Sequence, residues 1–140
     1  MRIMDRLQPL GLLGMRIALG VIMIAHGFPK VFGGMHNVVG MISSLGLPWW
    51  SAYLSAWAEF FGGILILAGL FTRIAALAIL IDMVVAIAKV HWQHGLTGEG
   101  NYQFPMALAA LSLGLMTLGA GPFALDRLIR GPRWGKSKSE

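Results

Sequence analysis

Long apolar runs separated by short polar connections form the main pattern along this chain of 140 residues. Four of these runs have close to the ~20 residues that a helix needs to cross a hydrocarbon core of about 30 Å. The pattern predicts four transmembrane helices, at residues 9–28, 52–71, 74–91 and 104–124. Because only Thr72 and Arg73 connect the second and third helices, these neighbours should run antiparallel. We therefore expect one all-α domain over residues 1–140, an integral membrane protein folded as an up-down four-helix bundle.

The ends of the first predicted helix and the connection after it carry further signals. Pro9 suits the first turn of a helix, where its missing N–H group would be unpaired anyway. Phe28 precedes Pro29, and a residue before proline disfavours helical geometry. The following connection, residues 29–50, is longer than a turn, and apolar side chains recur at helical spacing within its segment MHNVVGMISSLG. This spacing predicts a short amphipathic helix in the first outer loop, at the membrane interface.

The composition agrees with a lipid environment. Apolar residues make up 56% of the chain and charged residues only 12%, against roughly 25% charged in an average soluble domain. The mean hydropathy is +0.70. The 19 glycines suit membrane helices, in which glycine allows close backbone approach. Arg16 interrupts the first apolar run, so we interpret that run as a helix of the mature protein rather than as a signal peptide.

The basic residues are distributed unevenly between the two sides that four spans define. One side carries the two ends of the chain and the short second connection, with Arg2, Arg6, Arg73, Arg127, Arg130, Arg133, Lys136 and Lys138. The opposite side carries Lys30 and Lys89 at helix ends. By the positive-inside rule, both termini should be cytoplasmic. The basic tail over residues 125–140 then has membrane lipid as its partner, and we expect no binding of nucleic acid.

The chain contains no cysteine. This excludes thiol–disulfide chemistry by the chain itself, thiolate-bound iron–sulfur clusters and thioether-attached haem. Zinc-ligand spacings, phosphate-binding glycine loops and nucleophile motifs are also missing from the sequence. We therefore predict neither a metal site nor an intrinsic cofactor.

Three ionisable residues fall near the centres of their predicted spans: Arg16, Glu59 and Asp82. A lone charge at that depth costs about 2.5–3.5 kcal/mol, so such side chains usually face the bundle interior and pair. We predict that Arg16 pairs with Glu59 or Asp82 in a buried polar core. One arginine cannot balance two carboxylates, which leaves a shared proton or a second cation, for which Lys89 is the candidate. Such a core either fixes the register of the helices or forms a ligand site or proton path.

The stretch AHGFPK, residues 25–30, places His26 and Lys30 one helical turn apart at the outer end of the first span. A histidine and a lysine in this position can hold a quinone carbonyl or an anionic head group, and we predict that both line a semi-polar pocket. A Lys30 side chain that extends its ammonium group to water is the alternative. Haem held by His26 and His91 is disfavoured, because His91 points about 180° away from Asp82 on the same helix.

Several stretches, taken together, resemble a known family. RIALGVIMIAHGFPKVFGG, WAEFFGGILILAGLFTRIAALAILIDMVVA and AGPFALDRL are similar to the DoxX family of small bacterial membrane proteins. The resemblance extends over about residues 14–128. The positions that carry it are Arg16, His26, Gly27, Lys30, Glu59, Gly62, Gly63, Gly69, Thr72, Arg73 and Asp126. Pro29 and the sequence AGPFALD depart from the family pattern.

The resemblance implies a four-helix protein of the bacterial inner membrane. Members of the family are similar to subunits of thiosulfate:quinone oxidoreductase or of oxidoreductase complexes that handle thiol stress, and distant relatives are chaperones or cargo receptors. We therefore expect a membrane subunit of a redox complex that binds a quinone or a similar lipid-soluble molecule next to a redox partner subunit. Arg16, Glu59 and Asp82 would form its polar core, with a carboxylate relaying protons, and His26 and Lys30 would contact the head group. The rival interpretation is a non-enzymatic assembly factor or scaffold; activity of the chain alone and a homo-oligomer both stay open.

Overall fold

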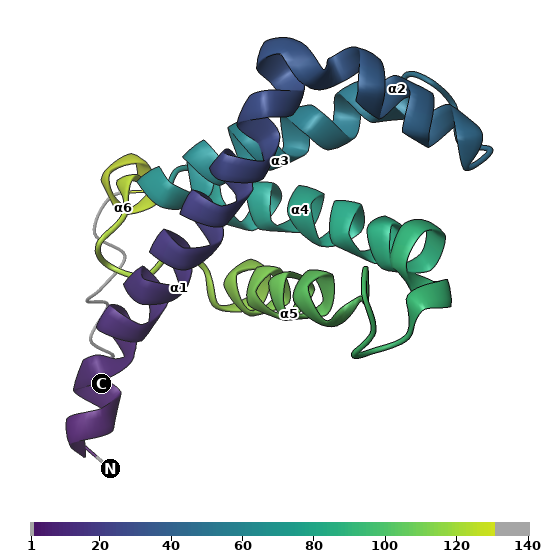
Figure 1. The fold of residues 1–140 in the computed structure, drawn as a ribbon. Helices are drawn as coiled ribbons and strands as arrows, with labels where there is room; N and C mark the ends of the chain where they lie inside the picture. Colours follow the sequence, from purple (N-terminus) through teal and green to yellow (C-terminus); the bar gives the residue numbers. More distant parts are fainter. Residues whose placement is uncertain (1, 131–140) are drawn as a thin grey trace, which may run out of the picture.

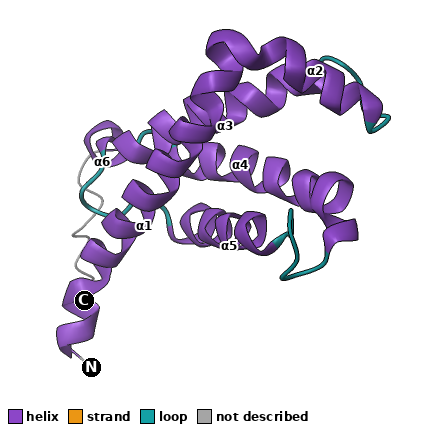
Figure 2. Ribbon diagram, in the orientation of Figure 1, coloured by secondary structure: helices purple, strands orange, loops and turns teal. Residues whose placement is uncertain are grey.

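The computed structural model describes residues 2–130, and all regular structure within that range is helical (Figure 2). The all-α class is therefore confirmed for this part of the chain. Its α-helices are α1 (Arg2–Pro29), α2 (Met35–Ser44), α3 (Ser51–Ala68), α4 (Thr72–Ala86), α5 (Gln103–Leu118) and α6 (Leu125–Arg130). Shorter segments extend two of them, namely the π-helices η1 (Lys30–Gly34) and η2 (Ile87–His91) and the 3-10 helix η3 (Trp92–His94). Most of the predicted basic tail, residues 131–140, lies outside the described residues.

Four helices pack side by side, in the order α1, α3, α4 and α5 (Figure 1). A smaller contact between α5 and α1 closes the group. The connection from α1 to α3 contains η1 and α2, and α2 folds back beside α3. The first turns of α1 project beyond the other helices (Figure 1). The core between the helices is apolar and consists of Leu19, Met23, Ile66, Ala75, Ala76, Ile79, Met83, Leu108 and Leu115.

Three helical segments are long and apolar enough to span a membrane: Arg2–Ser44, Ser51–Ala68 and Thr72–His94. α5 is also apolar but has 16 residues, fewer than the ~20 that a full crossing needs. The predicted fourth span extended to residue 124, whereas this helix ends six residues earlier. It ends at Gly119, whose positive φ of 83° departs from the helix and suits a residue without a Cβ atom.

α1 differs from the sequence prediction at both ends. It begins at Arg2 instead of Pro9, and it passes through both Pro9 and Pro29. A proline removes only one backbone donor, and the chain absorbs this loss at Pro29 by widening into the π-helix η1 rather than by leaving the helix. The helical path bends inside η1, at Phe32 and Gly33, whose φ values are −105° and 143°. α2 then follows within the segment for which the sequence predicts an amphipathic helix.

Glycines bring α1 and α3 into backbone contact and thereby fix their register. A Cβ atom added at Gly27 would lie 2.5 Å from the backbone nitrogen of Phe60, and one added at Gly20 would lie 2.9 Å from the carbonyl oxygen of Gly63. Only glycine allows two helices to approach this closely. Residue numbers fall along α1 as they rise along α3, so the two helices are antiparallel. The C-terminal end of α1 therefore lies beside the first half of α3.

Candidate functional site

Arg16, the buried arginine of α1, binds backbone oxygens at the end of α3 and in the segment between α5 and α6. The residue is only 2% exposed. Its Nε donates a hydrogen bond to the carbonyl oxygen of Ile66 (3.0 Å), and Nη2 donates to that of Leu67 (2.9 Å). Nη1 donates to the carbonyl oxygens of Ala120 (3.3 Å) and Phe123. The guanidinium group thus binds carbonyl groups of the last turn of α3, and its charge meets the negative end of the α3 dipole.

Gly69 and Asp126 complete this end of the bundle, which we call the Arg16 end. Gly69 has a φ of 70°, and a Cβ atom added to it would lie 2.5 Å from Arg16 Nη2, so only glycine leaves room for the guanidinium group. The Asp126 carboxylate accepts hydrogen bonds from the backbone N–H groups of Phe71 (2.7 Å) and Thr72 (3.0 Å). It thereby caps α4 and holds Phe71 at a φ of 47°, the one positive φ outside glycine within residues 2–130.

The predicted pairing of Arg16 with Glu59 or Asp82 is wrong. The four hydrogen bonds of Arg16 all go to backbone oxygens. Glu59 precedes Leu67, one of these partners, by eight residues along α3, which corresponds to about 12 Å at a rise of about 1.5 Å per residue. Arg16 and Glu59 both stand near the middle of their apolar runs, but the helices are antiparallel and offset. Arg16 consequently reaches the end of α3 instead of its centre.

A second polar group lies towards the opposite end of α1, between α1, α3 and α4. We call it the Lys30 cluster; its members are Lys30, Ser55, Glu59 and Asp82. Lys30 Nζ lies 2.7 Å from each carboxylate oxygen of Glu59 and donates a hydrogen bond to Oε1. The Glu59 side chain is 6% exposed, whereas that of Lys30 is 28% exposed. The partner of Glu59 is therefore a basic residue, as predicted. That residue is Lys30 in η1, which continues α1, instead of Arg16.

Asp82 approaches this ion pair from α4. Its carboxylate interacts with Ser55 and Glu59 on α3 and lies within the electrostatic reach of Lys30. Among the described residues, its enclosed Oδ2 atom has no hydrogen-bond partner, and Glu59 Oε2 lies close to Lys30 Nζ but outside hydrogen-bonding geometry. Two carboxylates thus share one ammonium group, and Asp82 Oδ2 is enclosed without a donor among the described residues. Enclosed polar atoms without hydrogen bonds are rare in folded proteins, so the cluster is the strongest candidate for a functional site.

His26 lies one turn before Lys30, but its contacts lead elsewhere. Its Nδ1 is 2.8 Å from the carbonyl oxygen of Ile22 in the same helix, and the side chain is exposed. Its ring centroid lies 5.8 Å from that of Phe104 at the start of α5. His26 therefore marks the contact between α1 and α5, while Lys30 turns towards α3. That both residues line one pocket stays a prediction.

Lys89, the residue expected as the second cation, is exposed on η2. Within residues 2–130 the ion pair that forms is Lys30–Glu59, so the positive charge beside the carboxylates comes from Lys30. Lys89 follows Asp82 by seven residues, a spacing that keeps two side chains on one face of a regular α-helix. The winding becomes π-helical at Ile87, so that spacing rule does not apply to Lys89.

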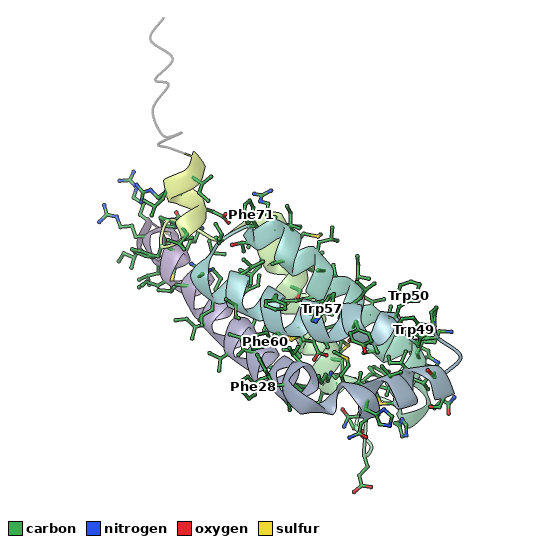
Figure 3. All side chains as sticks on the ribbon, turned by 90° about the horizontal axis from the view of Figure 1, so that it is seen from above. Phe28, Trp49, Trp50, Trp57, Phe60 and Phe71 are labelled. Atoms are coloured by element: carbon green, nitrogen blue, oxygen red, sulfur yellow. The ribbon has the colours of Figure 1, made fainter. Side chains whose placement is uncertain are left out.

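Aromatic residues neighbour Lys30 and Glu59 in the sequence and pack on one another. Phe28 and Phe32 flank Lys30 in the sequence, and their ring centroids are 4.9 Å apart. Both also pack against Phe60, the neighbour of Glu59, at 6.1 and 5.4 Å, and Figure 3 shows Phe28 beside Phe60. Phe28 and Phe32 are more than half exposed. These rings therefore form an aromatic contact between the end of the α1 path and α3.

Two surface hollows, of about 450 and 310 Å³, lie elsewhere on the described chain. The larger is beside α6. The smaller lies on α3 among Trp49, Trp50, Tyr53, Leu54 and Trp57. Trp49 and Trp50 stand near the opposite end of the molecule from Phe71 (Figure 3). Within residues 2–130, no three His, Asp or Glu side chains gather as metal ligands.

Sequence reasoning missed the roles of Ser55 and Asp126. Ser55 precedes Glu59 by four residues, so the spacing shows a shared face, but it does not show that the hydroxyl group meets Asp82 from the next helix. Asp126 was recognised only as a position of the family pattern. Its role as the cap of α4 depends on a contact across 55 residues, which no local signal predicts.

Apolar helices that enclose an ion pair between them define a helical membrane protein with a polar cluster inside its bundle. The chain belongs to the DoxX family, whose model matches residues 11–92. This range includes Lys30, Glu59 and Asp82, and it confirms the resemblance seen in the sequence.

Two bacterial relatives are similar to the chain along most of its length. The "Putative oxidoreductase CatD" of Bacillus subtilis (strain 168) is 31% identical over 126 residues, which cover 90% of this chain and 92% of the relative. The "Inner membrane protein YphA" of Escherichia coli (strain K12) is 33% identical over 129 residues, which cover 86% of this chain and 91% of the relative. No solved structure matches the chain.

Proposed function

We propose that the chain is a membrane subunit of a quinone-linked redox complex, and that it binds the head group of a quinone or of a similar lipid-soluble molecule at the Lys30 cluster. The observation that carries this proposal is the ion pair between Lys30 and the buried Glu59, with the second carboxylate of Asp82 beside it. Ionisable side chains inside a membrane protein are costly and usually functional. A relative whose name describes an oxidoreductase supports a redox role.

The cluster offers what a quinone head group needs from a binding site. Lys30 carries N–H donors and is the partly exposed member, so it is the point of approach. Glu59 and Asp82 can accept or return a proton. The chain has no cysteine and hence no thiol chemistry of its own, so electron transfer is assigned to a partner subunit.

The proposal includes an up-down four-helix arrangement, with α5 as the fourth span and both termini in the cytoplasm. The antiparallel packing of α1, α3, α4 and α5 supports this arrangement. The excess of basic residues at the Arg16 end, including the exposed Arg73 and Arg127, supports the orientation. The E. coli relative, named as an inner membrane protein, supports the location. In this orientation the Lys30 cluster lies in the periplasmic half of the membrane.

Calorimetric titration of the purified protein in nanodiscs with a short-chain benzoquinone tests the proposal. Wild type should bind saturably, and Lys30→Met/Glu59→Gln should bind about tenfold more weakly or worse, the effect of losing one hydrogen bond to a charged group. The double variant is chosen because Lys30→Met alone would leave Glu59 buried without a partner. Lys89→Met, which removes an exposed lysine at the same end of the bundle, is the matched control and should bind like wild type.

A non-enzymatic assembly factor is the second candidate, and the Arg16 end supports it, because the contacts of Arg16 there are architectural. On this alternative the Lys30 cluster only fixes the register of α1, α3 and α4. Wild-type protein that binds no quinone, or a double variant that binds as tightly as wild type, would contradict quinone binding at the cluster. The first of these results would favour the assembly factor.

A further inference from the structure

We propose that the larger surface hollow, beside α6, binds one anionic phospholipid, with the phosphate of the head group on Arg127 and an acyl chain along the apolar lining. The hollow has a volume of about 450 Å³ and is lined by α6, by the segment just before it and by Ala68 at the end of α3. Small-molecule sites typically have ~300–1,000 Å³. This site belongs to the Arg16 end of the bundle, so it does not depend on quinone binding at the Lys30 cluster.

The lining of the hollow is apolar except for one arginine. Phe123, Leu125 and Leu128 contribute large apolar side chains that are exposed, and Arg127 is exposed beside them. A short helix with exposed apolar side chains and a basic residue is typical of a segment that lies in the membrane interface. A surface that combines apolar groups with one cation fits a molecule that is both apolar and anionic, as an acidic phospholipid is.

The charges around the hollow favour an anion. Arg16 places a second positive charge behind the lining, because its Nη1 donates a hydrogen bond to the carbonyl oxygen of Phe123. The carboxylate of Asp126 is negative, but it is turned to the backbone N–H groups of Phe71 and Thr72. Among residues 2–130, no carboxylate pairs with the guanidinium group of Arg127. That group can therefore offer its N–H donors to a phosphate, which arginine binds through two parallel hydrogen bonds.

Hydrogen bonds hold the walls of the hollow in place without a ligand. The backbone N–H group of Asp126 donates to the carbonyl oxygen of Gly69 (2.9 Å), and its carboxylate caps α4. Arg16 binds the segment that precedes α6. These contacts tie α6 to the end of α3 and to the start of α4, beside which it lies in Figure 1. A preformed site loses less conformational freedom on binding, whereas a basic tail attracts anionic lipids by charge alone.

Native mass spectrometry of the full chain in a non-ionic detergent tests the proposal. The protein is mixed with equimolar phosphatidylglycerol and phosphatidylcholine that carry the same acyl chains, so that the two lipids differ in net charge. Wild type should retain one molecule of phosphatidylglycerol and bind it about tenfold more tightly than phosphatidylcholine, the effect of one hydrogen bond to a charged group.

Two pairs of variants separate the charge from the apolar lining. Arg127→Gln should remove the preference for phosphatidylglycerol, whereas Arg73→Gln, at an exposed arginine of the same end that does not line the hollow, should keep it. Leu128→Gln should weaken the binding of both lipids, because the acyl chain loses an apolar contact. Ile129→Gln is its control, since Ile129 is exposed on α6 but lies outside the lining. Leu128 is 78% exposed, so its replacement leaves the core of the bundle intact.

Equal retention of the two lipids by wild type would overturn the proposal. Equal losses of the preference from Arg127→Gln and Arg73→Gln would also overturn it, because the attraction would then be a property of the whole basic end. Displacement of phosphatidylglycerol by inorganic phosphate at constant ionic strength would show that the ligand is a free anion instead of a lipid. A lipid-free dimer that Leu128→Gln dissociates and Ile129→Gln does not would assign the hollow to a second copy of the chain.

Discussion

Replacing Arg16 tests whether this side chain holds the end of α3, and the expected effect follows from its contacts. Arg16→Met removes the guanidinium group and its hydrogen bonds to the carbonyl oxygens of Ile66, Leu67, Ala120 and Phe123. A hydrogen bond to a charged group contributes about 1.5–3 kcal/mol, but these four share one donor group and are not additive. We expect the free energy of unfolding to fall by about 3–5 kcal/mol, the range for breaking a buried charged contact.

The assay is reversible unfolding of the purified protein in mixed micelles, with a rising SDS content followed by tryptophan fluorescence. Arg6→Met is the matched control, because it removes the same charge from an exposed position of α1. It should change the free energy of unfolding by no more than about 0.5 kcal/mol. Arg16→Lys should fall between Arg16→Met and wild type, since one ammonium group cannot reach all the oxygens that the planar guanidinium fork reaches.

A double variant decides between the observed contacts of Arg16 and a direct pair with Glu59. The two side chains belong to different ends of the bundle, so the losses from Arg16→Met and Glu59→Gln should add within about 0.5 kcal/mol. A coupling energy above about 1 kcal/mol between them would refute the reasoning and restore the direct pair. A loss below about 1 kcal/mol from Arg16→Met alone would show that its hydrogen bonds do not hold the end of α3.

Three further predictions concern packing, capping and topology. Gly27→Leu should push α1 away from α3 and lower the free energy of unfolding by about 1–3 kcal/mol or more, whereas Gly14→Leu, where an added Cβ meets nothing within 4 Å, should be tolerated. Thermal denaturation compares the two, and equal effects would contradict the close approach. Asp126→Ala should cost about 1–2 kcal/mol through loss of the α4 cap, with Asp126→Asn intermediate in the same assay. Reporter fusions after Glu140 and within residues 93–103 should report opposite compartments, and a shared compartment would contradict the topology.

The helices could be predicted from the sequence because long apolar runs in a chain of this composition have few alternative structures. The residues at which the helices begin and end could not be predicted in this way. Pro29 is a sound local stop signal, but the chain changes to π-helical winding there instead of leaving the helix. Whether a helix stops or changes its winding depends on what the following residues contact. Here Lys30 binds Glu59 and Phe32 packs on Phe60, and both partners are far away in the sequence.

The sequence predicted only part of the candidate site, again because contacts between distant segments decide the rest. Glu59 and Asp82 stand out because ionisable residues in apolar runs are rare, and both belong to the observed cluster. The identity of the cation could not be read from the sequence, because it depends on the offset between α1 and α3. The partners of Arg16 are backbone oxygens, which every residue has, so no sequence pattern distinguishes them.

The two ends of the bundle use buried charge in opposite ways, and this difference bears on function. At the Arg16 end, all three side-chain nitrogens of Arg16 and both oxygens of Asp126 are hydrogen bonded. At the Lys30 cluster, two carboxylates share one ammonium group, and the helices depart from α-helical winding in η1 and η2. Each enclosed acceptor without a donor destabilises by about 1–3 kcal/mol, a large share of the 5–15 kcal/mol of stability that is typical of a folded protein. The Arg16 contacts offset this cost from a distance. Arg16→Met should therefore lower the fraction of folded protein, while the molecules that stay folded bind ligand with wild-type affinity.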